Sequence, residues 1–179
     1  MFTITIGEIE YALPFNRQVI EMFLPHRGWS LLVDQIDEID LVNGRAVGRW
    51  TVNPDHPMLE GHFPEFRVFP GHLTAEAAAQ VAGFLLGEEL VGKIPMLDGT
   101  DMKYTGSVVP GEVIVTTAIA VPHSDQKKRM ARVHVAVGQT TVAEGFITAR
   151  LVTRRAMARL EKGGVLLHRL DASPTFVEI

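Results

Sequence analysis

One imidazole and one carboxyl group lie close together in this sequence, around a loop that is rich in proline. His62 stands in the segment 61–71, and Glu76 follows in an alanine-rich stretch that begins at Gly71. Imidazole titrates near neutral pH and can act as a general base, whereas a buried carboxyl can stay protonated and act as an acid. The free N–H groups at a helix start favour negative charge, and Gly71 lets a substrate oxygen approach them closely. This set of groups is suited to proton transfer on a carbonyl compound.

The helix predicted from Gly71 to about residue 90 carries a polar stripe. His72, Glu76 and Gln80 are four residues apart and share one face. Such a stripe is often only the solvated side of an amphipathic helix. The positions around it are mostly alanine, namely Ala75, Ala77, Ala78 and Ala79. This composition indicates a buried helix, on which a carboxylate needs a partner or a function.

Other readings of the histidines remain open at this point. A loop histidine such as His62 is often a surface residue or a local hydrogen-bond donor. His56, Glu60 and His62, or His72 with Glu76, could each supply part of a metal ligand set. Neither spacing matches a recognised metal signature, and the proline after His56 prevents a helix that would align the first set. We therefore expect no metal.

Composition limits the class of protein. The chain has 179 residues, of which 46% are hydrophobic, and we expect one domain over residues 1–179. A formal net charge of −4 does not favour a nucleic-acid partner, and the absence of cysteine excludes disulfides and thiolate chemistry. Neither a signal peptide nor a membrane-spanning run is evident, so we expect a cytoplasmic protein.

The pattern of elements predicts an α+β fold. We expect a short helix over residues 15–23, a hairpin over 30–39 and 45–52 turning at Asn43-Gly44, and an irregular loop over 53–70. The long helix is followed by strands over 100–104, 112–121, 130–137 and 141–152. Because the strands do not alternate with crossover helices, a meander packed on one helix is favoured over an α/β fold. The domain core is predicted over residues 15–152, with an extension over 153–179. The basic cluster Arg150, Arg154, Arg155 and Arg159 is either a solvated surface or a site for an acidic partner.

The order of several motifs resembles the FabZ-type (3R)-hydroxyacyl-[acyl-carrier-protein] dehydratases. The matching landmarks occur in family order over most of the chain: Leu24-Pro25-His26-Arg27, Leu31-Leu32-Val33-Asp34, Gly61-His62-Phe63-Pro64, Val68-Phe69-Pro70-Gly71, Glu76-Ala77, Ala79-Gln80 and Val109-Pro110-Gly111. The resemblance implies a hotdog fold, in which a curved antiparallel sheet wraps around a long central helix. It also implies homodimers whose active sites combine residues of both subunits, and often trimers of such dimers.

The same resemblance implies a reaction and its residues. Water is lost from a 3-hydroxyacyl chain on acyl carrier protein, giving the trans-2-enoyl thioester, without metal or organic cofactor. His62 is implied as the base and Glu76, kept protonated by burial, as the acid supplied by the opposite subunit. The Gly71 amide would hold the thioester oxygen, and Gln80 would orient the carboxyl of Glu76. Four further residues are expected to line or modulate the substrate tunnel: Phe63, Val68, Phe69 and His72.

Some positions depart from the family pattern. Arg67 replaces a usual proline, His72 replaces a small aliphatic residue, and Gly28-Trp29-Ser30 and Thr105-Gly106-Ser107 replace proline-containing runs. An imidazolium at His72 would lower the pKa of Glu76, one helical turn away. Together with the added residues at both ends, these changes suggest a specialised member that serves a polyketide-type carrier protein.

Two alternatives differ in function but not in fold. The chain could be a non-catalytic hotdog subunit that binds acyl chains or a partner, although this does not explain why both His62 and Glu76 are present. It could also be a hotdog thioesterase, in which the acid activates water on the thioester carbonyl. The proline-rich histidine loop favours the dehydratase.

Overall fold

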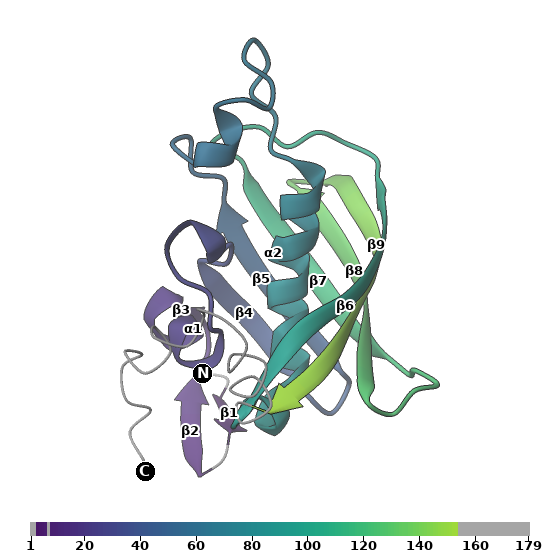
Figure 1. Cartoon of the computed structure of the whole chain (residues 1–179). Coiled ribbons are helices and arrows are strands. Elements are labelled where there is room, and N and C mark those ends of the chain that lie inside the picture. The colour runs from purple at the N-terminus through teal and green to yellow at the C-terminus, as the bar shows by residue number, and fades with distance from the viewer. Residues whose placement is uncertain (1–2, 7, 154–179) are drawn as a thin grey trace, which may run out of the picture.

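A curved antiparallel sheet wrapped around one helix forms the body of the molecule in the computed structural model, which describes residues 3–6 and 8–153 (Figure 1). Within these residues the main sheet has seven strands in the order β3-β4-β5-β7-β8-β9-β6, all paired antiparallel. The strands are β3 (Phe15–Asn16), β4 (Gln35–Asp40), β5 (Arg45–Thr51), β6 (Lys93–Tyr104), β7 (Val113–Val121), β8 (Lys128–Val137) and β9 (Thr140–Thr153). A separate hairpin joins β1 (Thr3–Ile6) to β2 (Ile9–Ala12). This is the expected hotdog architecture.

The central helix α2 (Gly71–Gly83) is buried against the sheet along most of its length. Small residues permit this close approach: a Cβ atom on Gly48 of β5 would lie 2.9 Å from Cγ2 of Val81. The α-helical geometry ends earlier than expected, because residues 84–90 form the 3-10 segment η3 (Phe84–Leu90). Gly87 adopts a φ of 50° there, a left-handed conformation that interrupts a regular helix.

Two strands have other boundaries than the sequence predicted. The strand expected over 30–39 begins at Gln35, because the backbone at Ser30 and Leu32 bonds to a side chain of α2 instead of to a neighbouring strand. Leu32 N–H donates to Oε1 of Gln80, and Ser30 O accepts from Nε2 of the same side chain. Strand β6 starts at Lys93 instead of residue 100, and within the described part of the chain it pairs only with β9. A strand at the edge of a sheet tolerates Pro95 and Gly99, which obscured it in the sequence.

The remaining elements lie beside the sheet. Helix α1 (Arg17–Phe23) matches the expected short helix and is capped by Asn16, whose side chain accepts from Val19 N–H. The 3-10 turn η1 (Gly28–Ser30) follows it. The loop over 53–70 is irregular as expected, apart from the 3-10 turn η2 (Pro57–Leu59). It rises above the start of α2 in Figure 1.

An aromatic cluster anchors the end of α2 to the N-terminal elements. The ring of Phe84, which is 1% exposed, lies edge-on to Phe15 and Phe23, with centroids 6.2 and 6.1 Å away. We predict that Phe84→Ala lowers the free energy of unfolding by about 3–5 kcal/mol, because it opens a cavity in this cluster. Phe66→Ala is the matched control, since Phe66 is 76% exposed. Urea unfolding that shows equal stability for the two variants would contradict this packing.

Some expectations concern residues outside those described. The extension beyond Thr153, with Arg154, Arg155 and Arg159, lies there, as do Met1 and Phe2 among the added residues at the N-terminus. The seven-stranded sheet runs from Phe15 to Thr153. The single domain over residues 1–179 and its core over 15–152 stay predictions. No helix of the described part is both long and apolar enough to cross a membrane.

Candidate active site

Glu76 lies on the second turn of α2, half-buried, and one of its two carboxyl oxygens receives both of its contacts. Oε1 accepts a hydrogen bond of 2.8 Å from Nε2 of Gln80 and lies 3.3 Å from Nε2 of His26. Among the described residues, Oε2 has no hydrogen-bond partner. The carboxyl is therefore held from one side and open on the other.

Gln80 is buried and uses its whole amide group. Its Oε1 accepts from Leu32 N–H at 2.9 Å, and its Nε2 donates to Ser30 O and to Glu76, both at 2.8 Å. This amide joins α2 to the segment before β4. It also holds the carboxyl of Glu76 through Oε1, and the orienting role of Gln80 in catalysis stays a prediction.

The surroundings lower the pKa of Glu76. The hydrogen bond from His26 is the largest cause; burial opposes it, and the bond from Gln80 and the charge of His26 add to it. The expectation that burial keeps Glu76 protonated is thus wrong for the single chain, because its donors outweigh desolvation. His72 is exposed and is not among the groups that shift this pKa. His26, for which the sequence pattern predicted no role, is the histidine that lowers the pKa of Glu76 instead of His72.

The lowered pKa predicts a pH dependence of stability. A carboxyl whose pKa is lower in the folded state than in the unfolded state stabilises the fold fully at pH values above its unfolded-state pKa. This stabilisation is lost as the pH falls through the folded-state pKa. On acidification, the free energy of unfolding of the wild type should therefore fall more steeply than that of Glu76→Gln. Urea unfolding at a series of pH values measures the difference. Parallel curves for the two proteins would show that Glu76 is not held as a carboxylate.

His62 is fixed within the loop before α2. Its Nδ1 lies 2.9 Å from the carbonyl oxygen of Val68, whose N–H donates to His62 O. Since a carbonyl only accepts, Nδ1 carries the proton, and the neutral ring presents an unprotonated Nε2. The ring of Phe63, which is 57% exposed, stacks on the imidazole at a centroid distance of 4.4 Å.

The start of α2 offers unpaired donors. Pro70 precedes the helix without a side-chain cap, and its carbonyl accepts from Leu73 N–H. Within the described residues, the N–H groups of Gly71 and His72 have no acceptor. A Cβ atom on Gly71 would lie 3.1–3.3 Å from the ring of Tyr104, so only glycine fits this contact without a shift.

A cavity of about 550 Å³ runs from Glu76 toward the hairpin between β7 and β8. Glu76, His26 and Gln80 line one part of it. Most of the other lining residues are apolar, among them Leu24, Leu86, Leu97, Met130, Ile147 and Ala149. The cavity thus combines a carboxyl group with an apolar channel.

The expected loop residues do not line this cavity within one chain. Neither His62 nor Phe63, Val68 and His72 belong to its wall. Phe69 is a buried core residue, and the centroid of its ring lies 4.9 Å from that of Trp50. The base and the acid implied by the sequence therefore stand in separate parts of a single chain.

The metal alternative finds no support in the described residues, where no group of three or more histidine, aspartate or glutamate side chains could hold an ion. His56 is a buried structural residue instead. Its Nδ1 accepts from Met58 N–H, its Nε2 lies 3.2 Å from Trp29 O, and its ring packs edge-on against that of Phe69. Both nitrogens are occupied by local contacts.

Comparisons with known proteins bear on this site. The family model for the FabA-like domain matches residues 24–146. A 3-hydroxyacyl-[acyl-carrier-protein] dehydratase FabZ of Clostridioides difficile is 35% identical over 144 residues, which are 78% of this chain and 99% of the relative. The FabZ of Xanthomonas oryzae pv. oryzae is 36% identical over 110 residues, which are 59% of this chain and 72% of that relative.

Solved structures share the fold. One is the dehydratase heterocomplex ApeI:P from Xenorhabdus doucetiae, with a TM-score of 0.64 and 18% identity over 84% of this chain and 98% of that one. Another is the fluoroacetyl-CoA thioesterase FlK, with a TM-score of 0.61 and 17% identity. The match covers 73% of this chain and 100% of that one. At these identities the likeness concerns the fold alone.

Proposed function

Because the chain belongs to the FabZ-type hydroxyacyl thioester dehydratases, with a FabA-like domain over residues 24–146, we propose that it dehydrates 3-hydroxyacyl chains on acyl carrier protein. The observation that carries the proposal is the carboxyl of Glu76, held on one oxygen and free on the other, in the wall of an apolar cavity. Such a cavity suits an acyl chain, and a free carboxyl oxygen suits its hydroxyl group.

In the proposed reaction, each bond that forms or breaks is assisted by a named residue. Nε2 of His62 takes the proton from C2, and the electrons of that C–H bond form the C2–C3 double bond. The bond from C3 to the hydroxyl oxygen breaks, and Glu76 supplies the proton that makes water the leaving group. The N–H of Gly71 stabilises the negative charge that develops on the thioester oxygen. Gln80 keeps the carboxyl oriented through this cycle.

Glu76 must be protonated to donate a proton in the dehydration reaction, although its pKa is lowered in the single chain. Burial already raises this pKa, against the two hydrogen bonds that lower it. A bound acyl chain and a second subunit exclude more water from the cavity and strengthen the effect of burial. We propose that the carboxyl gains its proton when the site is closed.

We also propose a homodimer, and a trimer of dimers, in which His62 of one subunit meets Glu76 of the other. In support, His62 does not line the cavity that holds Glu76 in its own chain. In addition, β6 is an edge strand, and it exposes Met96 and Leu97. An exposed edge with apolar side chains is a natural pairing site for a second copy.

One experiment separates the dehydratase from its two rivals. Purified protein is given 3-hydroxyacyl thioesters on acyl carrier protein, and enoyl absorbance and free thiol are followed together. Rising enoyl absorbance without thiol release is the expected result. Thiol release alone would establish a thioesterase, and binding without either signal would establish a non-catalytic subunit. Supplying the acyl chain on coenzyme A, in parallel, determines the preferred carrier.

Fatty-acid synthesis is the setting that the FabZ relatives support, and a polyketide-type carrier protein is the finer proposal. It rests on the departures at Arg67, His72 and residues 28–30 and 105–107. The cytoplasmic location and the lack of any metal or organic cofactor stay predictions.

A further inference from the structure

We propose that His26 is a positioning residue of this site, which together with Gln80 holds Oε1 of Glu76 so that Oε2 alone faces the substrate hydroxyl. The proposal rests on the proposed function and deepens it. It assigns to His26 a role that acts through Glu76, without contact to the acyl chain's reacting atoms.

The contact geometry carries the inference. Nε2 of His26 lies 3.3 Å from Oε1 of Glu76. The same oxygen accepts a hydrogen bond of 2.8 Å from Nε2 of Gln80. These donors come from two elements, the turn after α1 and the next turn of α2. Two donors on one oxygen leave the carboxyl little freedom to rotate, and the oxygen without a partner is presented to the cavity.

The other ring nitrogen of His26 indicates which form of the imidazole does this. Nδ1 is buried and has no hydrogen-bond partner among the described residues. Because no acceptor faces Nδ1, a proton on Nε2 is the one that can be shared with a neighbour, and Nε2 is the nitrogen that faces Oε1 of Glu76. His26 therefore acts on Glu76 through Nε2.

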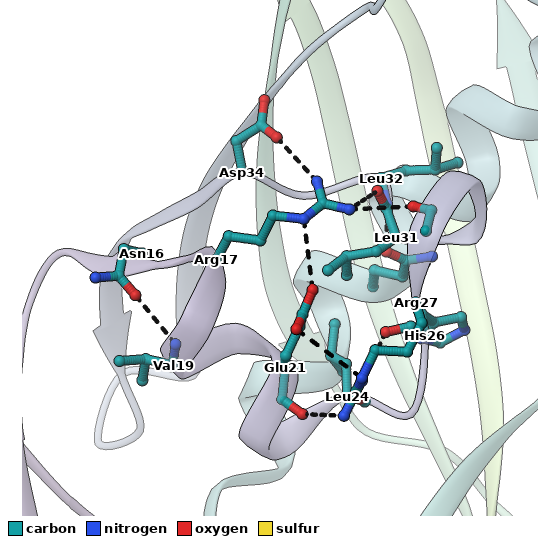
Figure 2. Close-up of polar contacts among 12 residues, drawn as sticks. Asn16, Arg17, Val19, Glu21, Leu24, His26, Arg27, Leu31, Leu32 and Asp34 are labelled. Atoms are coloured by element: carbon teal, nitrogen blue, oxygen red, sulfur yellow. Dashed lines mark hydrogen bonds and ion pairs between the residues drawn. The ribbon is translucent and has the colours of Figure 1, made fainter. Parts of the chain in front are cut away.

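The backbone that carries His26 is itself fixed, as Figure 2 shows. The guanidinium of Arg27 donates to the carbonyl oxygens of Glu21, Leu24 and His26, at 2.6, 2.6 and 2.7 Å. This ties the turn after α1 to the end of that helix. The imidazole thus projects toward α2 from a rigid segment.

Other charged groups near Glu76 are engaged elsewhere. The β7–β8 hairpin contributes His123, Lys128 and Arg129 to the same cavity, and these contact Asp125, Asp98 and Glu89, respectively. On α2 itself, His72 is exposed, and at the helix start the ring of Tyr104 from β6 packs on Gly71. Within the described residues, His26 is the only one of these groups that contacts Glu76.

Removal of the donor should affect turnover more than binding. In His26→Leu, Glu76 gains rotational freedom, so we expect the pH-independent kcat to fall about 10- to 100-fold with KM nearly unchanged. The hydrogen bond from His26 is the largest cause of the low pKa of Glu76, so its loss raises this pKa. Since dehydration requires the protonated acid, the high-pH decline of kcat/KM should move to higher pH.

The experiment compares His26→Leu with His26→Gln, whose amide can donate from a similar position. We expect His26→Gln to recover most of kcat and the wild-type pH profile. His134→Leu, on the outer face of β8, is the control and should behave as wild type. In a Glu76→Gln background, His26→Leu should cause no further loss, because both changes act on the same carboxyl.

Several outcomes would overturn the inference. These are wild-type kcat and pH profile in His26→Leu, equal losses in His26→Leu and His26→Gln with no shift of the pH profile, or full additivity with Glu76→Gln. If His26→Leu fails to fold, the test uses the pH profile of His26→Gln. The inference is also overturned if this profile departs from that of the wild type as far as the profile of Glu76→Gln does. Failure of the proposed function is distinct, because the wild type would then form no enoyl thioester.

Discussion

Glu76→Gln is expected to lower kcat for dehydration about 10²- to 10⁴-fold, the usual contribution of a general acid. The amide is nearly isosteric and can still accept from Gln80, but it cannot give a proton to the leaving hydroxyl group. KM should change little, because the apolar cavity that receives the acyl chain is left intact. Enoyl absorbance in a steady-state assay on 3-hydroxyacyl-carrier protein gives both constants.

Glu88→Gln is the matched control. Glu88 lies in η3, beyond the end of α2, and is exposed. The same substitution there should leave kcat within the error of the wild type. Turnover of Glu76→Gln at the level of this control would exclude Glu76 as the acid.

His62→Ala is expected to cause a loss of similar size, about 10²- to 10⁴-fold in kcat, through removal of the base. The Nδ1–H bond to Val68 O leaves Nε2 as the only nitrogen of the neutral ring able to take a proton. Exchange of the C2 proton of a bound substrate with solvent deuterium, followed by NMR, should stop together with dehydration.

The control for this substitution is His134→Ala. His134 is an exposed residue of β8 whose Nε2 lies 2.8 Å from Oγ1 of Thr141. Its loss should leave both exchange and turnover unchanged. Undiminished C2 exchange in His62→Ala would show that another group removes the proton.

Sequence reasoning predicted those parts of the molecule that depend on local pattern. The order of elements, the turn at Asn43-Gly44 and the helix that starts at Gly71 follow from glycine, proline and apolar spacing near each residue. The break at Gly87 was missed, because a single glycine in a helical pattern is tolerated and does not by itself mark an end.

Contacts between distant segments could not be predicted in this way. Gln80 bonds to the backbone at Ser30 and Leu32, and His26 reaches Glu76 across the fold. These pairs are far apart in the sequence, and nothing in the pattern around His26 indicates a carboxyl partner. The sequence therefore named His72, four residues away on the same helix, as the group acting on Glu76. Only the fold shows that His72 is exposed.

The fold does not determine the chemistry. The dehydratase heterocomplex ApeI:P and the thioesterase FlK share this architecture with the chain. Function on a common fold depends on the site. In this chain the features of the site are the asymmetric contacts of the Glu76 carboxyl and the fixed ring of His62.

Mixing two inactive variants tests the central claim most directly. His62→Ala and Glu76→Gln chains with different tags are co-expressed, and assemblies that carry both tags are purified. If base and acid come from opposite subunits, each mixed dimer has one intact site and should show about half of the wild-type activity. Mixed assemblies as inactive as either parent would contradict a site shared between two subunits.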